Sequence, residues 1–446
     1  MGKLLIFNST KEIRFIKIIK FIIPTYLTSL FNTVYTIVDG IFVSKYVGTD
    51  ALAAINIVYP IVNILTGIAL AFSTGGSAIA AIYIGSGKKD KANEIFSICI
   101  IISSLIGCII SILFYINLPT ILKLLGATQI TFDNCKTYAL WWLIGTPVVI
   151  GKELFTYFIR VDGSSTYSFS MALAGGILNI ILDYIFVGIL KLGVLGAVLA
   201  TILGLLCSFS MGIYYFIKMN NNIKFIKCKL HLKTGFKCIL NGISEFINQL
   251  SIAITTIVFN KTAMNFLGED GIASVSIIMY LQFLFIGIYF GYSMGISPLI
   301  GYSYGNKKID ICNMLEKYSY IFLCIISVLI YALTFFVSPI CVSLFAEKNS
   351  NVYILSVLGM RIYGLGFLFS GINIFTSIRM IAYGKGYISG TITFLRSFAL
   401  LILFLIILPN YLGINGIWLS VPFSEFITLF VSILIIIIFN KNKLTN

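Results

Sequence analysis

Three polar residues inside apolar segments have the chemistry to bind a proton or a small cation. Asp39 lies in the first apolar run of the chain, and Asn179 and Asp183 lie one helical turn apart in GILNIILDYIF, residues 176–186. A carboxylate at the centre of a bilayer costs at least about 2.5–3.5 kcal/mol, so such groups face a bundle interior or a water-filled cavity. Their oxygens suit Na+, and desolvation beside a second carboxylate favours proton uptake.

Polar side chains on the same helix faces are expected to support this site. Asn32, Tyr35 and Asp39 recur at intervals of three and four residues and therefore share a face. Pro24 removes a hydrogen bond from the first helix and favours a bend there. The predicted coupling site is Asp39, Asn179, Asp183 and Thr201, and the predicted supporting pocket is Pro24, Asn32, Tyr35 and Tyr138.

The composition requires a membrane around these residues. Hydrophobic residues make up 59% of the 446 and charged residues 11%, with a mean hydropathy of +1.01, whereas a soluble domain has about 25% charged residues. Apolar stretches of about 20 residues, long enough to cross the hydrocarbon core, recur along the whole chain. The net charge of +15 lies in short patches between these stretches, so we expect no nucleic-acid partner. The sequence predicts an all-α polytopic membrane protein.

Charged clusters and turn residues divide the chain into twelve transmembrane helices. The predicted spans are residues 15–43, 52–84, 95–118, 138–159, 166–188, 193–217, 238–266, 271–304, 317–339, 352–379, 386–408 and 413–439. With the N-terminus inside, inner loops hold 22 Lys and Arg residues, among them Lys3, Lys11 and Arg14, and outer loops hold six. The positive-inside rule therefore predicts that both termini are cytoplasmic.

The sequence contains an internal repeat at an offset of 220 residues. GTDALAAINIVYPI at 48 aligns with GEDGIASVSIIMYL at 268, and the register continues to Gly85 and Gly305. Each half has an even number of spans, so the halves form two six-helix lobes related by a pseudo-two-fold axis along the membrane normal. We assign residues 1–217 to the first lobe, 218–237 to a basic cytoplasmic linker and 238–446 to the second lobe.

The polar residues of the two halves differ. At an offset of 221, Leu400 and Phe404 stand where the first half has Asn179 and Asp183, which places ion coupling in the first lobe. We interpret Arg361 or Arg396 as a structural partner of a carboxylate. Lys152 and Glu153 are adjacent, an arrangement in which helical side chains pair poorly, and their role stays open. The only histidine, His231, lies in the central loop, and the nine cysteines are scattered, so no transition metal or other cofactor is expected.

Aromatic and methionine side chains in spans 2 and 8 suggest a substrate cavity between the lobes. Such surfaces bind varied apolar cations through cation–π contacts and adaptable packing. The candidate lining residues are Tyr59, Met279, Tyr280, Phe283 and Met294, with Glu245 as an acidic neighbour.

Three stretches resemble those of the multidrug and toxic compound extrusion (MATE) family, in its branch of MepA-type and DinF-type bacterial exporters. They are VDGIFVSKYVGTDALAAINIVYPI at 38–61, GGILNIILDYIFV at 175–187 and ISPLIGYSYGNKK at 296–308. The resemblance implies a cation or proton site in the first lobe at Asp39, Asn179, Asp183 and Thr201, and a bend at Pro24. Other branches place coupling on a glutamate in span 7, matched by Glu245, and an aspartate in span 10, which this chain lacks.

The resemblance implies a secondary active antiporter and not an enzyme. It would export amphipathic, often cationic drugs or toxic compounds in exchange for H+ or Na+, as a multi-pass monomer in the bacterial plasma membrane. Two alternatives stay open: a flippase for lipid-linked saccharides, which predicts a central cavity lined by several arginines, and a sensor or scaffold that transports nothing.

Overall fold

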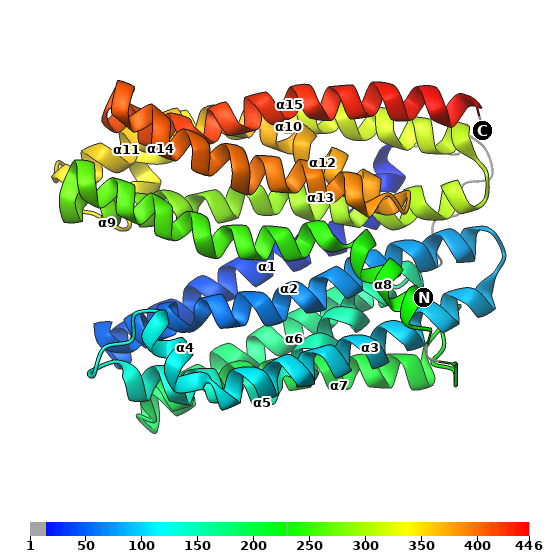
Figure 1. Ribbon diagram of the computed structural model, residues 1–446, viewed down its shortest axis with the longest axis horizontal. Helices are drawn as coiled ribbons and strands as arrows, with labels where there is room; N and C mark the ends of the chain where they lie inside the picture. The colour runs from blue at the N-terminus through cyan, green and yellow to red at the C-terminus, as the bar shows by residue number, and fades with distance from the viewer. Residues whose placement is uncertain (1–14, 230, 446) are drawn as a thin grey trace.

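Two helical bundles lie side by side in the computed structural model, which describes residues 15–229 and 231–445 (Figure 1). Lys3, Lys11 and Arg14 of the predicted inner loops lie outside the described residues. The first bundle contains α1 (Phe15–Tyr46), α2 (Thr49–Gly85), α3 (Lys89–Ile116), α4 (Leu118–Leu124), α5 (Phe132–Val161), α6 (Ser165–Asp183), the π-helical turn η2 (Tyr184–Ile189) and α7 (Gly193–Lys218).

The second bundle follows a short linking helix, α8 (Leu232–Asn241). It contains α9 (Ile243–Gly305), α10 (Ile309–Val342), α11 (Asn351–Tyr363), the 3₁₀ turn η3 (Gly364–Gly366), α12 (Phe367–Ala382), α13 (Gly386–Phe394), the π-helical turn η4 (Leu395–Ala399), α14 (Leu400–Leu412) and α15 (Ile414–Thr445). In Figure 1, α1 begins and α15 ends at the same end of the molecule. We call it the terminal end.

Within the described residues, eleven helices are long and apolar enough to cross a membrane. One of them, α9, has 63 residues and would be about 95 Å long if straight, about three times the thickness of a hydrocarbon core. It is interrupted at Gly268, where φ is 66° and ψ is −150°, a conformation open to glycine and strained for other residues. The two arms of α9 are therefore separate spans, and the predicted twelve-helix architecture is confirmed.

The outer surface is apolar, as a lipid-facing surface must be. On α3, five aliphatic side chains at spacings of one to four residues are more than half exposed: Leu105, Ile109, Ile112, Leu113 and Ile116. Since a soluble protein rarely exposes a contiguous patch of this kind, this face of α3 is suited to acyl chains.

The first helix crosses from one bundle to the other. At its start, Ile18 and Ile22 are buried in a core made mainly of second-bundle side chains, including Tyr292 and Leu323. Near its end, Val43 belongs to a core made of first-bundle residues. Because α1 contacts both bundles, a change in its packing reaches both.

Helix boundaries differ from the predicted spans mainly at the ends. Most helices extend a few residues further, because the terminal turns continue into polar residues that periodicity does not mark. The predicted span 7 begins at residue 238, but α8 ends at Asn241 and α9 begins at Ile243. Part of the predicted linker is helical, and α4 is a short helix outside the predicted spans.

Candidate functional site

Asp39, Asn179 and Asp183 meet inside the first bundle. Asp183 is fully buried as the last residue of α6, directly before η2, and Asn179 lies one turn earlier with 3% exposure. Asp39 on α1 lies close to Asp183, and Asn179 is a second neighbour of Asp183. Within the described residues, Asp39 Oδ1, both Asp183 carboxylate oxygens and both Asn179 amide atoms have no partner in hydrogen-bond geometry.

Unpartnered buried polar atoms of this kind fit a bound proton or cation. Each such atom costs about 1–3 kcal/mol when left without a partner, and more when it is charged. Two facing carboxylates repel each other when both are ionised, and a shared proton or a Na+ ion between them removes the repulsion. The π-helical turn after Asp183 is a further irregularity of a type often found at functional sites.

A small cavity lies beside Asn179, the neighbour of the carboxylate pair, and neither Asp39 nor Asp183 is among its lining residues. Four of the predicted residues line it: Asn32, Tyr35, Asn179 and Thr201. Ser208 and the small residues Gly175, Gly176 and Gly204 also line it. About 20 Å³ is open to the centre of a water-sized sphere, room for one water molecule or a small ion. The cavity therefore gives the pair a polar neighbourhood from α1, α6 and α7.

The remaining predicted residues of the supporting pocket are placed differently. Tyr138 on α5 is 3% exposed and lies near both aspartates. Pro24 lies outside the cavity, within α1, where its carbonyl accepts a hydrogen bond from Thr28 Oγ1 at 2.8 Å. From this position an effect of Pro24 on the site would have to pass through the path of the helix.

Lys152 also lines this cavity, and sequence reasoning gave it no role. Its Nζ lies 2.7 Å from Glu153 Oε1, with side chains 9% and 16% exposed. The prediction that these adjacent residues pair poorly is therefore wrong: the long, flexible lysine side chain reaches its neighbour, and burial favours pairing of the two charges. The sequence signal that could have pointed to this pair is the presence of two consecutive ionisable residues within an apolar span.

The predicted substrate residues do not form one cluster. Tyr59 on α2 lies near Asp39, Tyr35 and Tyr280, so the two bundles approach each other there. Tyr280 stacks on Phe345 with ring centres 6.2 Å apart, in an open groove of about 450 Å³. Phe283 is 44% exposed, and Met279 Sδ accepts a weak contact from Thr256.

Met294 and Glu245 lie apart from that groove. Met294 is 9% exposed and lines a different cavity, toward the terminal end. Glu245, in the first turn of α9, is 6% exposed and within electrostatic range of Arg396 and Tyr157.

Three polar residues of the second bundle, Asn373, Arg396 and Glu425, form a hydrogen-bonded network. Arg396 Nη1 lies 2.9 Å from Glu425 Oε1, and Asn373 Nδ2 donates to Glu425 Oε2 at 2.8 Å. The prediction that Arg396 pairs with a carboxylate is confirmed. Arg361 instead lies over the Phe335 ring at 4.7 Å and donates to the Phe335 carbonyl oxygen. The charges of this network are paired, whereas the polar atoms around Asp183 have no hydrogen-bond partner among the described residues.

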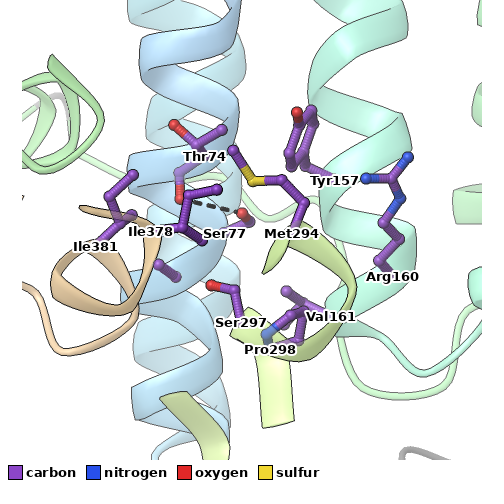
Figure 2. A pocket seen from close by; sticks show the side chains of 11 residues that line it. Thr74, Ser77, Tyr157, Arg160, Val161, Met294, Ser297, Pro298, Ile378 and Ile381 are labelled. Carbon is purple, nitrogen blue, oxygen red and sulfur yellow. Dashed lines mark hydrogen bonds between the residues drawn. The ribbon is translucent and has the colours of Figure 1, made fainter. Parts of the chain in front are cut away.

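A second small cavity lies between the bundles near the terminal end (Figure 2). Figure 2 shows Thr74 and Ser77 of α2 on one side, Tyr157 and Arg160 of α5 on another, and Met294 and Ser297 of α9 between them. The flippase alternative predicted a central cavity lined by several arginines, whereas Arg160 is the one arginine among the described residues that line this cavity. That alternative is not favoured.

Taken together, the fold and the site define an integral membrane protein of the transporter type: two packed helical repeats with open, buried carboxylates inside the first. The sequence model of the MatE family matches residues 24–185 and 244–407, one block in each bundle. The chain belongs to the MatE family.

Relatives cover nearly the whole chain. The chain is 26% identical over 436 residues to "Multidrug export protein MepA" of Staphylococcus haemolyticus (strain JCSC1435), covering 95% of this chain and 93% of that protein. It is 26% identical over 441 residues to the protein of the same name from Staphylococcus aureus (strain N315), covering 95% and 94%. A structure described as "Outward-facing conformation of a multidrug resistance MATE family transporter of the MOP superfamily" superposes with a TM-score of 0.90 at 22% identity, over 96% of each chain.

Proposed function

We propose that this protein exports amphipathic, often cationic compounds across the plasma membrane in exchange for H+ or Na+. The observation that carries the proposal is the open pair Asp39–Asp183 beside a small polar cavity, inside a MATE-family fold. The relatives named for multidrug export support the substrate class. The positive-inside bias supports an orientation in which the terminal end is cytoplasmic, and we expect the chain to act as a monomer.

Ion binding would act on the packing of α1 against α6. When both carboxylates are ionised, their repulsion opposes close approach of the two helices; a proton or Na+ between them removes it. Since α1 also packs into the second bundle through Ile18 and Ile22, this local change alters how the bundles meet. An ion and a drug that favour different arrangements of the bundles are thereby coupled through the equilibrium between them.

The oxygen atoms available at the site suit either a proton or Na+ as the coupling ion. Carboxylate and amide oxygens of Asp39, Asp183 and Asn179 would ligate Na+, and a carboxyl pair would share a proton equally well. Neither histidine nor cysteine adjoins this group among the described side chains, and no cluster of three His, Cys, Asp or Glu that could hold a metal occurs in that part of the chain.

The test is efflux of a cationic fluorescent dye from proteoliposomes with a pH gradient and a Na+ gradient imposed separately. We expect one gradient to drive efflux and Asp39→Asn and Asp183→Asn to abolish it while the protein stays folded. The matched control is Asp133→Asn, because Asp133 is an exposed carboxylate at the start of α5. Full activity in both aspartate variants would remove the assignment of the site, and movement of labelled lipid without dye efflux would indicate a flippase.

A further inference from the structure

Arg160 is a buried charge that has no carboxylate partner among the residues that the structure describes. It lies at the end of α5 and is 5% exposed. Its Nε donates to Ser168 Oγ at 3.2 Å, and its guanidinium carbon lies 4.9 Å from the centre of the Tyr157 ring. Neither contact supplies a negative charge, and a buried charge is retained at low cost only when it is paired and hydrogen-bonded.

The other ion pairs show what Arg160 lacks. Three pairs within 4 Å join described residues: Lys152–Glu153, Arg379–Glu316 and Arg396–Glu425. Arg160 takes part in none of them. Glu153, two turns earlier on α5, is within electrostatic range of Arg160 but is bound to Lys152. Within α5, Lys152, Glu153 and Arg160 carry one more positive than negative charge. The carboxylate of Asp162, directly after α5, is bonded to Tyr215 and to the backbone amides of residues 221–223 instead of to Arg160.

The cavity beside Arg160 has the size and the polar groups for a small anion. It is lined by Arg160, Thr74, Ser77, Tyr157, Met294 and Ser297, among others (Figure 2). Guanidinium and hydroxyl groups are hydrogen-bond donors for anions. About 20 Å³ is open to the centre of a water-sized sphere, which admits one small inorganic ion and excludes a drug-sized molecule.

We propose that this cavity binds a single small monovalent anion of the halide type, held by Arg160. The lining comes from α2 and α5 of the first bundle and from α9 and α12 of the second. Separating the bundles at the terminal end takes Ser297 and Met294 away from Arg160 and opens the cavity. The anion therefore binds the arrangement that is closed at this end and shifts the equilibrium toward it. This site is independent of the coupling ion and of the exported compound.

Thermal unfolding of the purified full-length protein in detergent tests the site. Chloride or bromide is titrated against gluconate at constant ionic strength, since gluconate is too large for the cavity. We expect a saturable rise of a few degrees in Tm with both halides, because a ligand that binds only the folded state stabilises it. Arg160→Gln should lose this dependence, and Ser297→Ala should require several-fold more halide for half of the rise.

The matched control is Arg361→Gln, which removes an arginine bonded to Phe335 and outside the cavity. It should keep the full halide response. A wild-type Tm that does not distinguish chloride from gluconate overturns the proposal, as does a halide response that survives in Arg160→Gln. A response to sulfate or phosphate but not to halide also overturns it, because it contradicts the size of the cavity. If Arg160→Gln does not fold, the wild-type titration and Ser297→Ala decide by the same criteria.

Discussion

Gly85 and Gly305 occupy equivalent positions in the two repeats, and each packs against the other's helix. A Cβ atom on Gly85 would lie 2.0 Å from the Tyr302 carbonyl oxygen, and one on Gly305 would lie 2.0 Å from the Ile82 carbonyl oxygen. Ile82 and Tyr302 are themselves 220 residues apart, so the contact is reciprocal about the pseudo-two-fold axis. It holds α2 and α9 in backbone contact at the terminal end, where both helices finish.

Gly305→Ala should loosen this contact. The added methyl group meets main-chain atoms that cannot move aside, so we expect a loss of about 1–3 kcal/mol of folding stability and slower export, because the closed arrangement at this end is disfavoured. Thermal unfolding and dye efflux measure the two effects. Gly40→Ala is the stability control, because a Cβ on Gly40 has no described atom within 4 Å; an equal loss in both variants would contradict the explanation.

Asn179→Leu should separate stability from transport. The second repeat has Leu400 at the equivalent position, and the Asn179 amide has no partner in hydrogen-bond geometry among the described residues. Removing unpartnered buried polar atoms is neutral or stabilising by about 1–3 kcal/mol. We therefore expect an unchanged or higher Tm together with loss of ion-driven efflux. A variant that keeps ion-driven efflux would show that Asn179 is not part of the ion site.

The pair Arg396–Glu425 should show strong coupling in a double-mutant cycle. Glu425→Leu alone leaves the Arg396 charge buried without its partner and should lower stability by about 3–5 kcal/mol. Arg396→Met combined with Glu425→Leu should recover most of that loss, since an apolar pair needs no compensation, and the Asn373 amide still donates to the Glu425 carbonyl. Additive losses in the double variant, measured by thermal unfolding, would contradict this.

Asp162 should anchor the linker between the bundles. Its buried carboxylate accepts hydrogen bonds from Tyr215 Oη and from the backbone amides of Asn221, Asn222 and Ile223, at 2.6–2.9 Å. Asp162→Ala leaves these four donors without that acceptor, so we expect a loss of at least about 2 kcal/mol and faster proteolysis after Lys224. Asp133→Ala, at an exposed site, is the control; equal cleavage rates in the two variants would show that Asp162 does not hold the linker.

Periodicity and composition were sufficient for much of this molecule. Apolar length predicts spans because a bilayer requires every backbone group to be bonded within its own helix, so twelve spans were readable without tertiary contacts. The 220-residue repeat predicted the equivalence of Gly85 and Gly305. Helix spacing also grouped Asn32 and Tyr35 on one face, and both line the first cavity.

Contacts between distant segments were decided only by the tertiary structure. Sequence spacing orders residues along one helix, but the meeting of Asp39 with Asp183 depends on how α1 packs on α6. The adjacent pair Lys152–Glu153 formed against the helix-spacing rule, because burial left no water to compete for either charge.

The sequence by itself determined that this is a two-repeat membrane protein with carboxylates buried in its first half. Hydropathy, charge bias and repetition are properties of the chain read in order, and they need no knowledge of packing. Only the tertiary structure decided that Asp39 and Asp183 meet with open oxygens, whereas Glu425 is closed by Arg396 and Asn373. It also placed Arg160 at the contact between the bundles without a carboxylate partner among the described residues. The physical reason is that partners for buried charges come from neighbouring helices, and their identity depends on packing in three dimensions.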